Sequence, residues 1–91
     1  MTNPEIDENG NKCWFNSNRE LHRANGPALI GSEGHVEWYK NGKWHREDGP
    51  AIYGPFGGYW YINGELHRED GPAVEYANGE KYWYINGKPI Q

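Results

Sequence analysis

A sequence repeat of about 23 residues occurs three times in this 91-residue chain and is followed by a partial fourth copy. Each full copy holds an aromatic pair, a His-Arg pair and a Gly-Pro-Ala element. The His-Arg pairs follow one another after 23 and 22 residues, and the Gly-Pro-Ala elements keep the same step. The aromatic pairs are Trp14-Phe15, Trp38-Tyr39, Trp60-Tyr61 and Trp83-Tyr84. Markers that share one period predict a stack of similar supersecondary units.

The local chemistry of each unit indicates antiparallel strands. Asn41-Gly42, Asn63-Gly64 and Asn86-Gly87 each follow an aromatic run, and Asn-Gly favours a type I′ hairpin turn because both residues tolerate positive φ. A second Gly-containing turn precedes the next aromatic pair. We therefore predict an all-β fold, an antiparallel meander of tandem 22–23-residue β-hairpin repeats in a single curled sheet.

The period divides the chain into two parts. Residues 12–91 form the predicted repeat domain, with units near 14–37, 38–59 and 60–82 and a partial unit at 83–91. Residues 1–11 show no period and carry acidic but no basic side chains, so we expect them to form a flexible acidic leader.

Strand alternation sorts the aromatic pairs onto two faces. Trp14, Trp38, Trp60 and Trp83 are expected on one face, and Phe15, Tyr39, Tyr61 and Tyr84 on the other. A thin sheet that is aromatic on both faces exposes a large apolar patch unless it curls or finds a partner. We therefore expect a binding face or a homodimer; the pattern leaves open which face is buried.

Composition excludes several classes of function. Residues 11–91 hold nine basic and ten acidic residues, whereas a nucleic-acid binder normally shows a basic stripe. Cys13 is the one cysteine, so no intramolecular disulfide can form, and we expect it to be buried beside Trp14. No signal peptide or membrane-spanning apolar run is visible, which favours a cytoplasmic protein without membrane contact.

The spacing of Tyr39, Asn41, Gly42 and His45, repeated 22 residues later, resembles the MORN repeat, a β-hairpin unit of about 23 residues. This chain has His-Arg-Glu-Asp-Gly-Pro-Ala where a MORN unit has His-Gly-x-Gly. It is thereby similar to a MORN-like variant of phage and giant-virus proteins. The resemblance implies a non-enzymatic scaffold or binding module of viral origin, in the host cytoplasm.

The His-Arg pairs are the candidate binding groups, together with neighbouring tryptophans. In full, the candidate residues are His22, Arg23, His45, Arg46, His67, Arg68, Trp38, Trp44, Trp60 and Trp83. The arginines could fork onto phosphate or carboxylate oxygens beside stacking rings. Alternatively, each His packs on its own unit's aromatic and each Arg pairs with nearby acids, which would join the repeats together. Both interpretations stay open.

We predict neither a catalytic residue nor a metal site, and no cofactor. His45 with Asp48, and the same pair one repeat later, supply two ligands, too few for a closed metal site. No nucleophile has a recognisable base, and no phosphate-cradling loop occurs. His35 falls outside the repeat phase, and we expect it on a turn in solvent.

These observations lead to two hypotheses of function. The first is a non-enzymatic protein-binding module, a small viral factor that binds and inhibits a host protein complex such as a defence system. The second is a binder of a small anionic ligand, such as a nucleotide or cyclic nucleotide, held between aromatic rings and His-Arg pairs.

Overall fold

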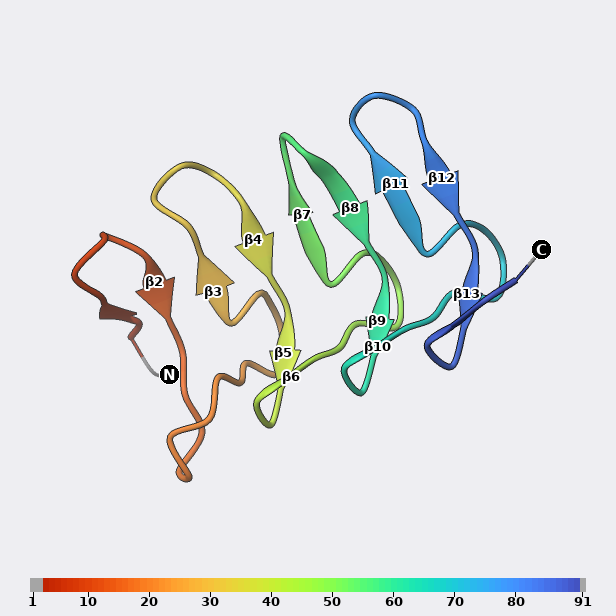
Figure 1. Ribbon diagram of the computed structural model, residues 1–91. Helices are drawn as coiled ribbons and strands as arrows, with labels where there is room; N and C mark the ends of the chain where they lie inside the picture. The colour runs from red at the N-terminus through yellow and green to blue at the C-terminus, as the bar shows by residue number, and fades with distance from the viewer. Residues whose placement is uncertain (1–2, 91) are drawn as a thin grey trace.

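A computed structural model describes residues 3–90, which form an elongated, all-β antiparallel meander of 41 × 26 × 18 Å (Figure 1). The predicted fold class is confirmed. Residues 1, 2 and 91, where the predicted leader begins and the partial fourth repeat ends, lie outside the described residues.

Eight strands form the main sheet. In spatial order they are β1 (Glu5–Ile6), β2 (Lys12–Cys13), β3 (Leu29–Ile30), β4 (Val36–Glu37), β7 (Ile52–Gly54), β8 (Gly57–Tyr59), β11 (Val74–Tyr76) and β12 (Lys81–Tyr82). Three further hairpins lie below this sheet in the view of Figure 1. They are β5 (Tyr39–Lys40) with β6 (Lys43–Trp44), β9 (Tyr61–Ile62) with β10 (Glu65–Leu66), and β13 (Tyr84–Ile85) with β14 (Lys88–Pro89).

A break at the tryptophan of each aromatic pair separates the upper sheet from the lower hairpins. Trp38 lies between β4 and β5, and its backbone N–H donates to the carbonyl of Ala51 at 2.6 Å. Trp60 donates to Ala73 in the same way, at 2.7 Å. The expected single sheet is thus one eight-stranded sheet and three two-stranded ones, because each long strand changes partner at its tryptophan.

The hairpin turns confirm the Asn-Gly prediction. Asn41 and Gly42 have φ values of 51° and 84°, the left-handed pair that a type I′ turn needs. The two later Asn-Gly turns have the same geometry. The first repeat lacks Asn-Gly and has only an isolated bridge between Phe15 and Leu21. Its turn is closed instead with Arg19 at a φ of 61°.

The core is thin, and the side chains that are fully buried in it are small. Ala28, Ala51 and Ala73, the alanines of the Gly-Pro-Ala elements, are fully buried. Each alanine accepts a backbone hydrogen bond from a tryptophan N–H and donates one to a neighbouring strand. Cys13 is buried as expected, and burial raises the pKa of its thiol.

The segment predicted as a flexible leader contains an edge strand. Within it, β1 pairs antiparallel with β2, with Glu5 opposite Cys13. The carboxylate of Asp7 accepts backbone N–H bonds from Asn9 and Asn11, both at 2.9 Å, which closes the turn between the strands. Glu5 also forms an ion pair with Arg19, so this edge is tied to the first repeat.

Candidate functional site

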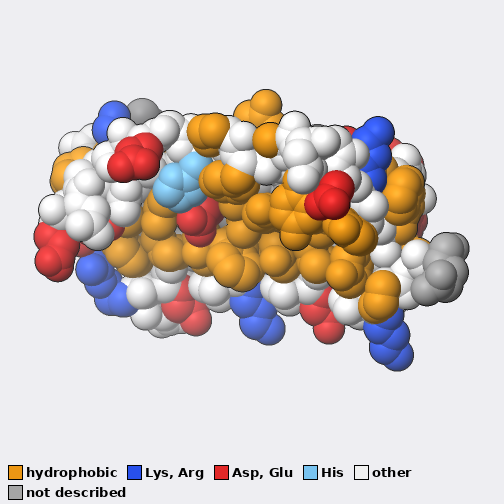
Figure 2. Space-filling model, turned by 45° about the horizontal axis from the view of Figure 1, so that its top comes forward, with side chains coloured by type: hydrophobic (Ala, Val, Ile, Leu, Met, Phe, Trp, Pro, Cys, Tyr) orange, Lys and Arg blue, Asp and Glu red, His pale blue; other side chains and the backbone are white. Residues whose placement is uncertain are grey.

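The two faces of the sheet have different chemistry. The tyrosine face carries Tyr39, Tyr61 and Tyr84, and the tryptophan face carries Trp14, Trp38, Trp60 and Trp83; both follow from the strand alternation. On the side of the molecule in Figure 2, hydrophobic side chains gather in a band that runs along the length of the protein. The lower edge of that band is rimmed by alternating basic and acidic side chains.

On the tryptophan face, three arginines stack on three indole rings. The guanidinium carbon of Arg23 lies 3.8 Å from the ring centroid of Trp14. Arg46 lies 3.9 Å from Trp38, and Arg68 3.9 Å from Trp60. Contacts this close are cation–π interactions, which favour arginine over lysine. No described guanidinium stacks on Trp83, which is 47% exposed.

Each arginine bonds to residues that follow it in the same corner of the chain. We define the first, second and third corners as residues 22–27, 45–50 and 67–72. The Nη1 atom of Arg46 donates to the carbonyl of Pro50 at 3.2 Å, and its Nε to Asp48 at 3.0 Å. A Cβ on Gly49 would lie 2.7 Å from the guanidinium carbon. A side chain at this position would therefore displace the guanidinium from its place over the indole ring.

Each histidine links its repeat to the next. The Nδ1 atoms of His22, His45 and His67 each accept the backbone N–H of the turn asparagine in the following unit at 3.0 Å; these asparagines are Asn41, Asn63 and Asn86. In the second and third corners the other ring nitrogen faces Glu47 at 3.4 Å and Glu69 at 3.2 Å. This geometry favours the interpretation in which the His-Arg pairs join the repeats, although the histidines bond to backbone instead of packing on aromatics.

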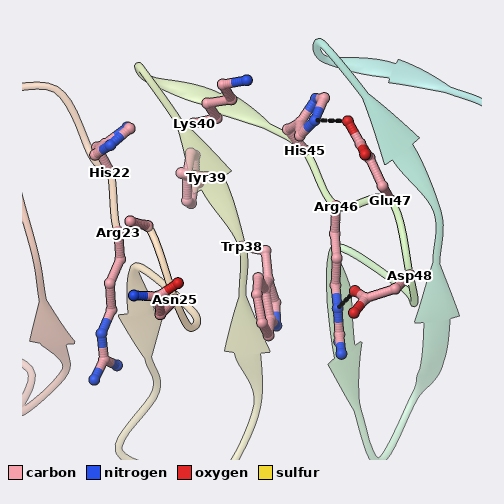
Figure 3. Close-up of a pocket in the computed structure, with 11 residues that line it drawn as sticks. His22, Arg23, Asn25, Trp38, Tyr39, Lys40, His45, Arg46, Glu47 and Asp48 are labelled. Carbon is pink, nitrogen blue, oxygen red and sulfur yellow. Dashed lines mark hydrogen bonds and ion pairs between the residues drawn. The ribbon is translucent and has the colours of Figure 1, made fainter.

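Two open clefts lie between successive corners. The first, of about 670 Å³, separates the first corner from the second, and the second, of about 610 Å³, separates the second corner from the third. Figure 3 shows the first cleft, with Arg23 along one side and Trp38 and Arg46 along the other. Three cations and two carboxylates line the first cleft, against two cations and four carboxylates in the second.

The tyrosine face holds a polar cluster that is not among the predicted site residues. Glu37 accepts hydrogen bonds from the hydroxyl of Tyr39 at 2.8 Å and from the indole N–H of Trp44 at 3.0 Å. Its second oxygen lies 3.0 Å from Nε2 of His35. His35 is thus half-buried, and our prediction that it stands in solvent was wrong: its ring packs against Gly31, which leaves no room there for a Cβ.

The cluster shifts two pKa values. Burial alone would raise the pKa of Glu37, but its hydrogen bonds from Trp44, Tyr39 and His35 hold it below the ordinary value. Burial, together with the neighbouring Glu37 carboxylate, raises the pKa of the Tyr39 hydroxyl. A signal for this cluster was present in the repeat alignment, where Glu37 stands in the position of Tyr59 and Tyr82.

A second group on the tyrosine face is aromatic and solvent-exposed. Phe56 stacks on Tyr59 at a ring distance of 5.6 Å, and Tyr59, Tyr76 and Tyr82 continue in edge contacts of 5.9 Å each. We call these four residues the aromatic ridge. Phe56, Tyr76 and Tyr82 are 41%, 41% and 45% exposed.

Trp44 lies apart from the other predicted tryptophans. Its ring contacts Tyr39 at 5.9 Å and Tyr61 at 5.0 Å, on the tyrosine face. The predicted site residues are therefore divided: the His-Arg pairs with Trp38 and Trp60 lie along the corners and clefts, and Trp44 belongs to the opposite side. Trp83 contributes to neither cleft.

Within residues 3–90 no three His, Cys, Asp or Glu side chains are grouped so as to hold a metal ion. The same residues include no helix long and apolar enough to cross a membrane. Comparison of the chain with protein-family models, with curated proteins and with solved structures found no match. Membership of a MORN-like family therefore stays a proposal that rests on the repeat motif.

Proposed function

We infer that this chain is a non-enzymatic module that binds a protein partner through the aromatic ridge. The observation that supports this function is the unbroken ring contact that runs from Phe56, in the turn between β7 and β8, across β8 and β11 to Tyr82 on β12. Aromatic side chains are enriched in the cores of protein interfaces because they bury a large area at a small entropic cost.

The backbone under the ridge is well suited to present it. β7, β8, β11 and β12 are paired in continuous register, with Val74 opposite both Tyr59 and Tyr82. Gly57 lies so close to Glu75 that a Cβ there would meet its carbonyl oxygen at 2.1 Å. A rigid strand arrangement lowers the ordering cost of association.

A small anionic ligand bound at every repeat has less support. In the second and third corners the arginines already stack on indoles and pair with Asp48 and Asp70. Their imidazoles bond a backbone N–H on one side and face a glutamate on the other. These groups have few donors left for a nucleotide.

Tyr53 provides a matched control for the ridge. It is 58% exposed and belongs to β7, but it alternates with Ile52 and so points to the opposite face from Tyr59. The test compares capture of proteins from a cognate cell lysate by the wild type, by Tyr76→Ser/Tyr82→Ser and by Tyr53→Ser, followed by calorimetry with the purified partner.

We expect the double ridge variant to lose the partner and Tyr53→Ser to retain it. Equal loss in both variants, or full retention by the ridge variant, would reject the ridge as the interface. Light scattering on the purified chain tests the alternative that a second copy of the chain covers the ridge. If the wild type is a homodimer and Tyr76→Ser/Tyr82→Ser dissociates it, the ridge is the dimer interface.

A further inference from the structure

The first corner differs from the other two in the residues that balance its charge. The second and third corners read His-Arg-Glu-Asp, whereas the first reads His22-Arg23-Ala24-Asn25. Both carboxylates of the motif are therefore missing from the first corner. Ala24 and Asn25 are exposed, as are the glutamate and aspartate that replace them in the other corners, so these positions are reached from solvent.

The missing carboxylates leave Arg23 with fewer partners than the other stacked arginines. Among the residues that the structure describes, its one hydrogen bond runs from Nη1 to the carbonyl of Pro27 at 3.2 Å, and no carboxylate lies within ion-pair distance. The Nε donor that meets Asp48 or Asp70 in the other corners has no such partner here. Its guanidinium is nevertheless stacked on Trp14 at 3.8 Å, close to the 3.9 Å of the other two stacks.

His22 likewise lacks the acidic partner that the corresponding histidines have. Its Nδ1 accepts the N–H of Asn41, so the neutral ring carries its hydrogen on Nε2. In the second and third corners that nitrogen faces Glu47 or Glu69, but the first corner has Ala24 at this place. The first corner thus offers an oriented imidazole N–H and an oriented guanidinium on consecutive residues, both without the acids of the other corners.

Lys40 adds a cation to this cleft alone. It lines the first cleft, and the equivalent position in the next two repeats is isoleucine. The first cleft is consequently cationic on balance, whereas the second, which lacks a lysine and has four carboxylates, is anionic. An anion would be attracted to the first cleft and repelled from the second.

We propose that the first corner is a binding site for two consecutive acidic residues, Glu-Asp, in a segment of a partner protein. The second and third corners serve as internal templates for the interaction. There a Glu-Asp dipeptide places one carboxylate 3.4 or 3.2 Å from the imidazole Nε2 and the next 3.0 Å from the arginine Nε. A partner's Glu-Asp would supply to His22 and Arg23 what the other corners supply to themselves.

The site is separate from the aromatic ridge, and its test is independent of the proposed function. The probe is the capped peptide acetyl-Gly-Glu-Asp-Gly-amide, titrated into the full ¹⁵N-labelled chain by NMR. We expect chemical-shift changes at the Arg23 Nε–H, the His22 ring nitrogens and Lys40, and little change at Arg46 and Arg68. A peptide with Gln-Asn in place of Glu-Asp is the neutral control and should cause no shifts.

Two variants make the experiment decisive. Each gives one corner the residues that another corner of this chain has at the same two positions, so both should fold. Ala24→Glu/Asn25→Asp restores the acids of the other corners and should weaken peptide binding about tenfold or more. Glu47→Ala/Asp48→Asn removes the acids from the second corner and should add new shifts at His45 and Arg46. Wild-type binding in Ala24→Glu/Asn25→Asp, or no peptide binding by the wild type, would overturn the proposal.

Inorganic phosphate and acetate form the remaining arms of the titration. If either ion shifts the Arg23 and His22 resonances at the same concentration as the peptide, the corner is a general anion site and the acidic segment is rejected as its ligand. If the peptide acts at a concentration at least about tenfold lower, the paired carboxylates are what the corner recognises.

Discussion

The Nδ1 atom of His45 accepts a hydrogen bond from the backbone N–H of Asn63, 18 residues further along the chain, at 3.0 Å. The same bond joins His22 to Asn41 and His67 to Asn86. Since the asparagine belongs to the turn of the following repeat, one imidazole in each unit fixes the distance to the next hairpin. The histidine of the repeated phrase is thus a connector between units.

Replacing His45 by alanine should therefore destabilise the protein. The Asn63 N–H loses its acceptor, and the expected fall in the free energy of unfolding is about 1 kcal/mol, measured by urea denaturation. Glu47→Gln is the control, because Glu47 is 79% exposed and a surface ion pair of this kind contributes little. A larger loss in Glu47→Gln than in His45→Ala would show that the outer side of the imidazole matters more than the link to Asn63.

Arg46→Lys should also destabilise, although it conserves the charge. Lysine cannot stack a planar group on Trp38 and cannot reproduce the geometry of the bonds to Asp48 and Pro50, so we expect a loss of about 1 kcal/mol. Arg19→Lys is the comparison: Arg19 also lies over a ring, at 4.2 Å from Phe15, but its side chain is 65% exposed. Its replacement should change the free energy of unfolding much less than Arg46→Lys does, because exposed charge contacts contribute little. Equal losses in the two variants would show that stacking on Trp38 adds no special stability.

The parts of the fold that follow from local backbone chemistry could be predicted from the sequence. The Asn-Gly dipeptides determine the hairpins because positive φ at two successive residues has few other uses, and the alternation of Trp38 and Tyr39 determines the two faces. The break at each tryptophan could not be predicted. It depends on a backbone bond to an alanine in the next strand pair, which no local pattern encodes.

The candidate site was predicted only in part, for a related reason. The His-Arg pairs were predicted as binding groups because they occur in every repeat. Residues that connect one repeat to the next also occur in every repeat, so repetition alone does not separate the two roles. The more distinctive chemistry lies where the repeat changes: at Glu37, which replaces an aromatic, and at Ala24 and Asn25, which replace two acids. Reading the differences between aligned repeats would have found both places.

Glu37 should make stability depend on pH in the acidic range. Its folded-state pKa lies below the ordinary value of 4.5, so it binds a proton less readily in the folded than in the unfolded chain. Its stabilisation is therefore fully present above about pH 4.5 and is lost as the pH falls through the folded-state value. Glu37→Gln should be less stable than the wild type at pH 7, and the difference should shrink below pH 4.5, as measured by thermal unfolding at both pH values. A difference that is the same at pH 7 and pH 3 would contradict this assignment.

Ala51 allows the thin core to be tested directly. Its side chain is fully buried, and its backbone bonds both Trp38 and Tyr59, so the surrounding strands cannot move apart without breaking the connection between two repeats. Ala51→Val adds two methyl groups at this point, and overpacking of this kind costs about 1–3 kcal/mol. Ala77→Val is the matched control, because Ala77 is exposed on the turn between β11 and β12 and the same added volume meets solvent there. Urea denaturation of both variants should show a large loss for Ala51→Val and nearly none for Ala77→Val. Similar curves for the two would mean that the strands around Ala51 move apart to admit a larger side chain, which would contradict tight packing at this position.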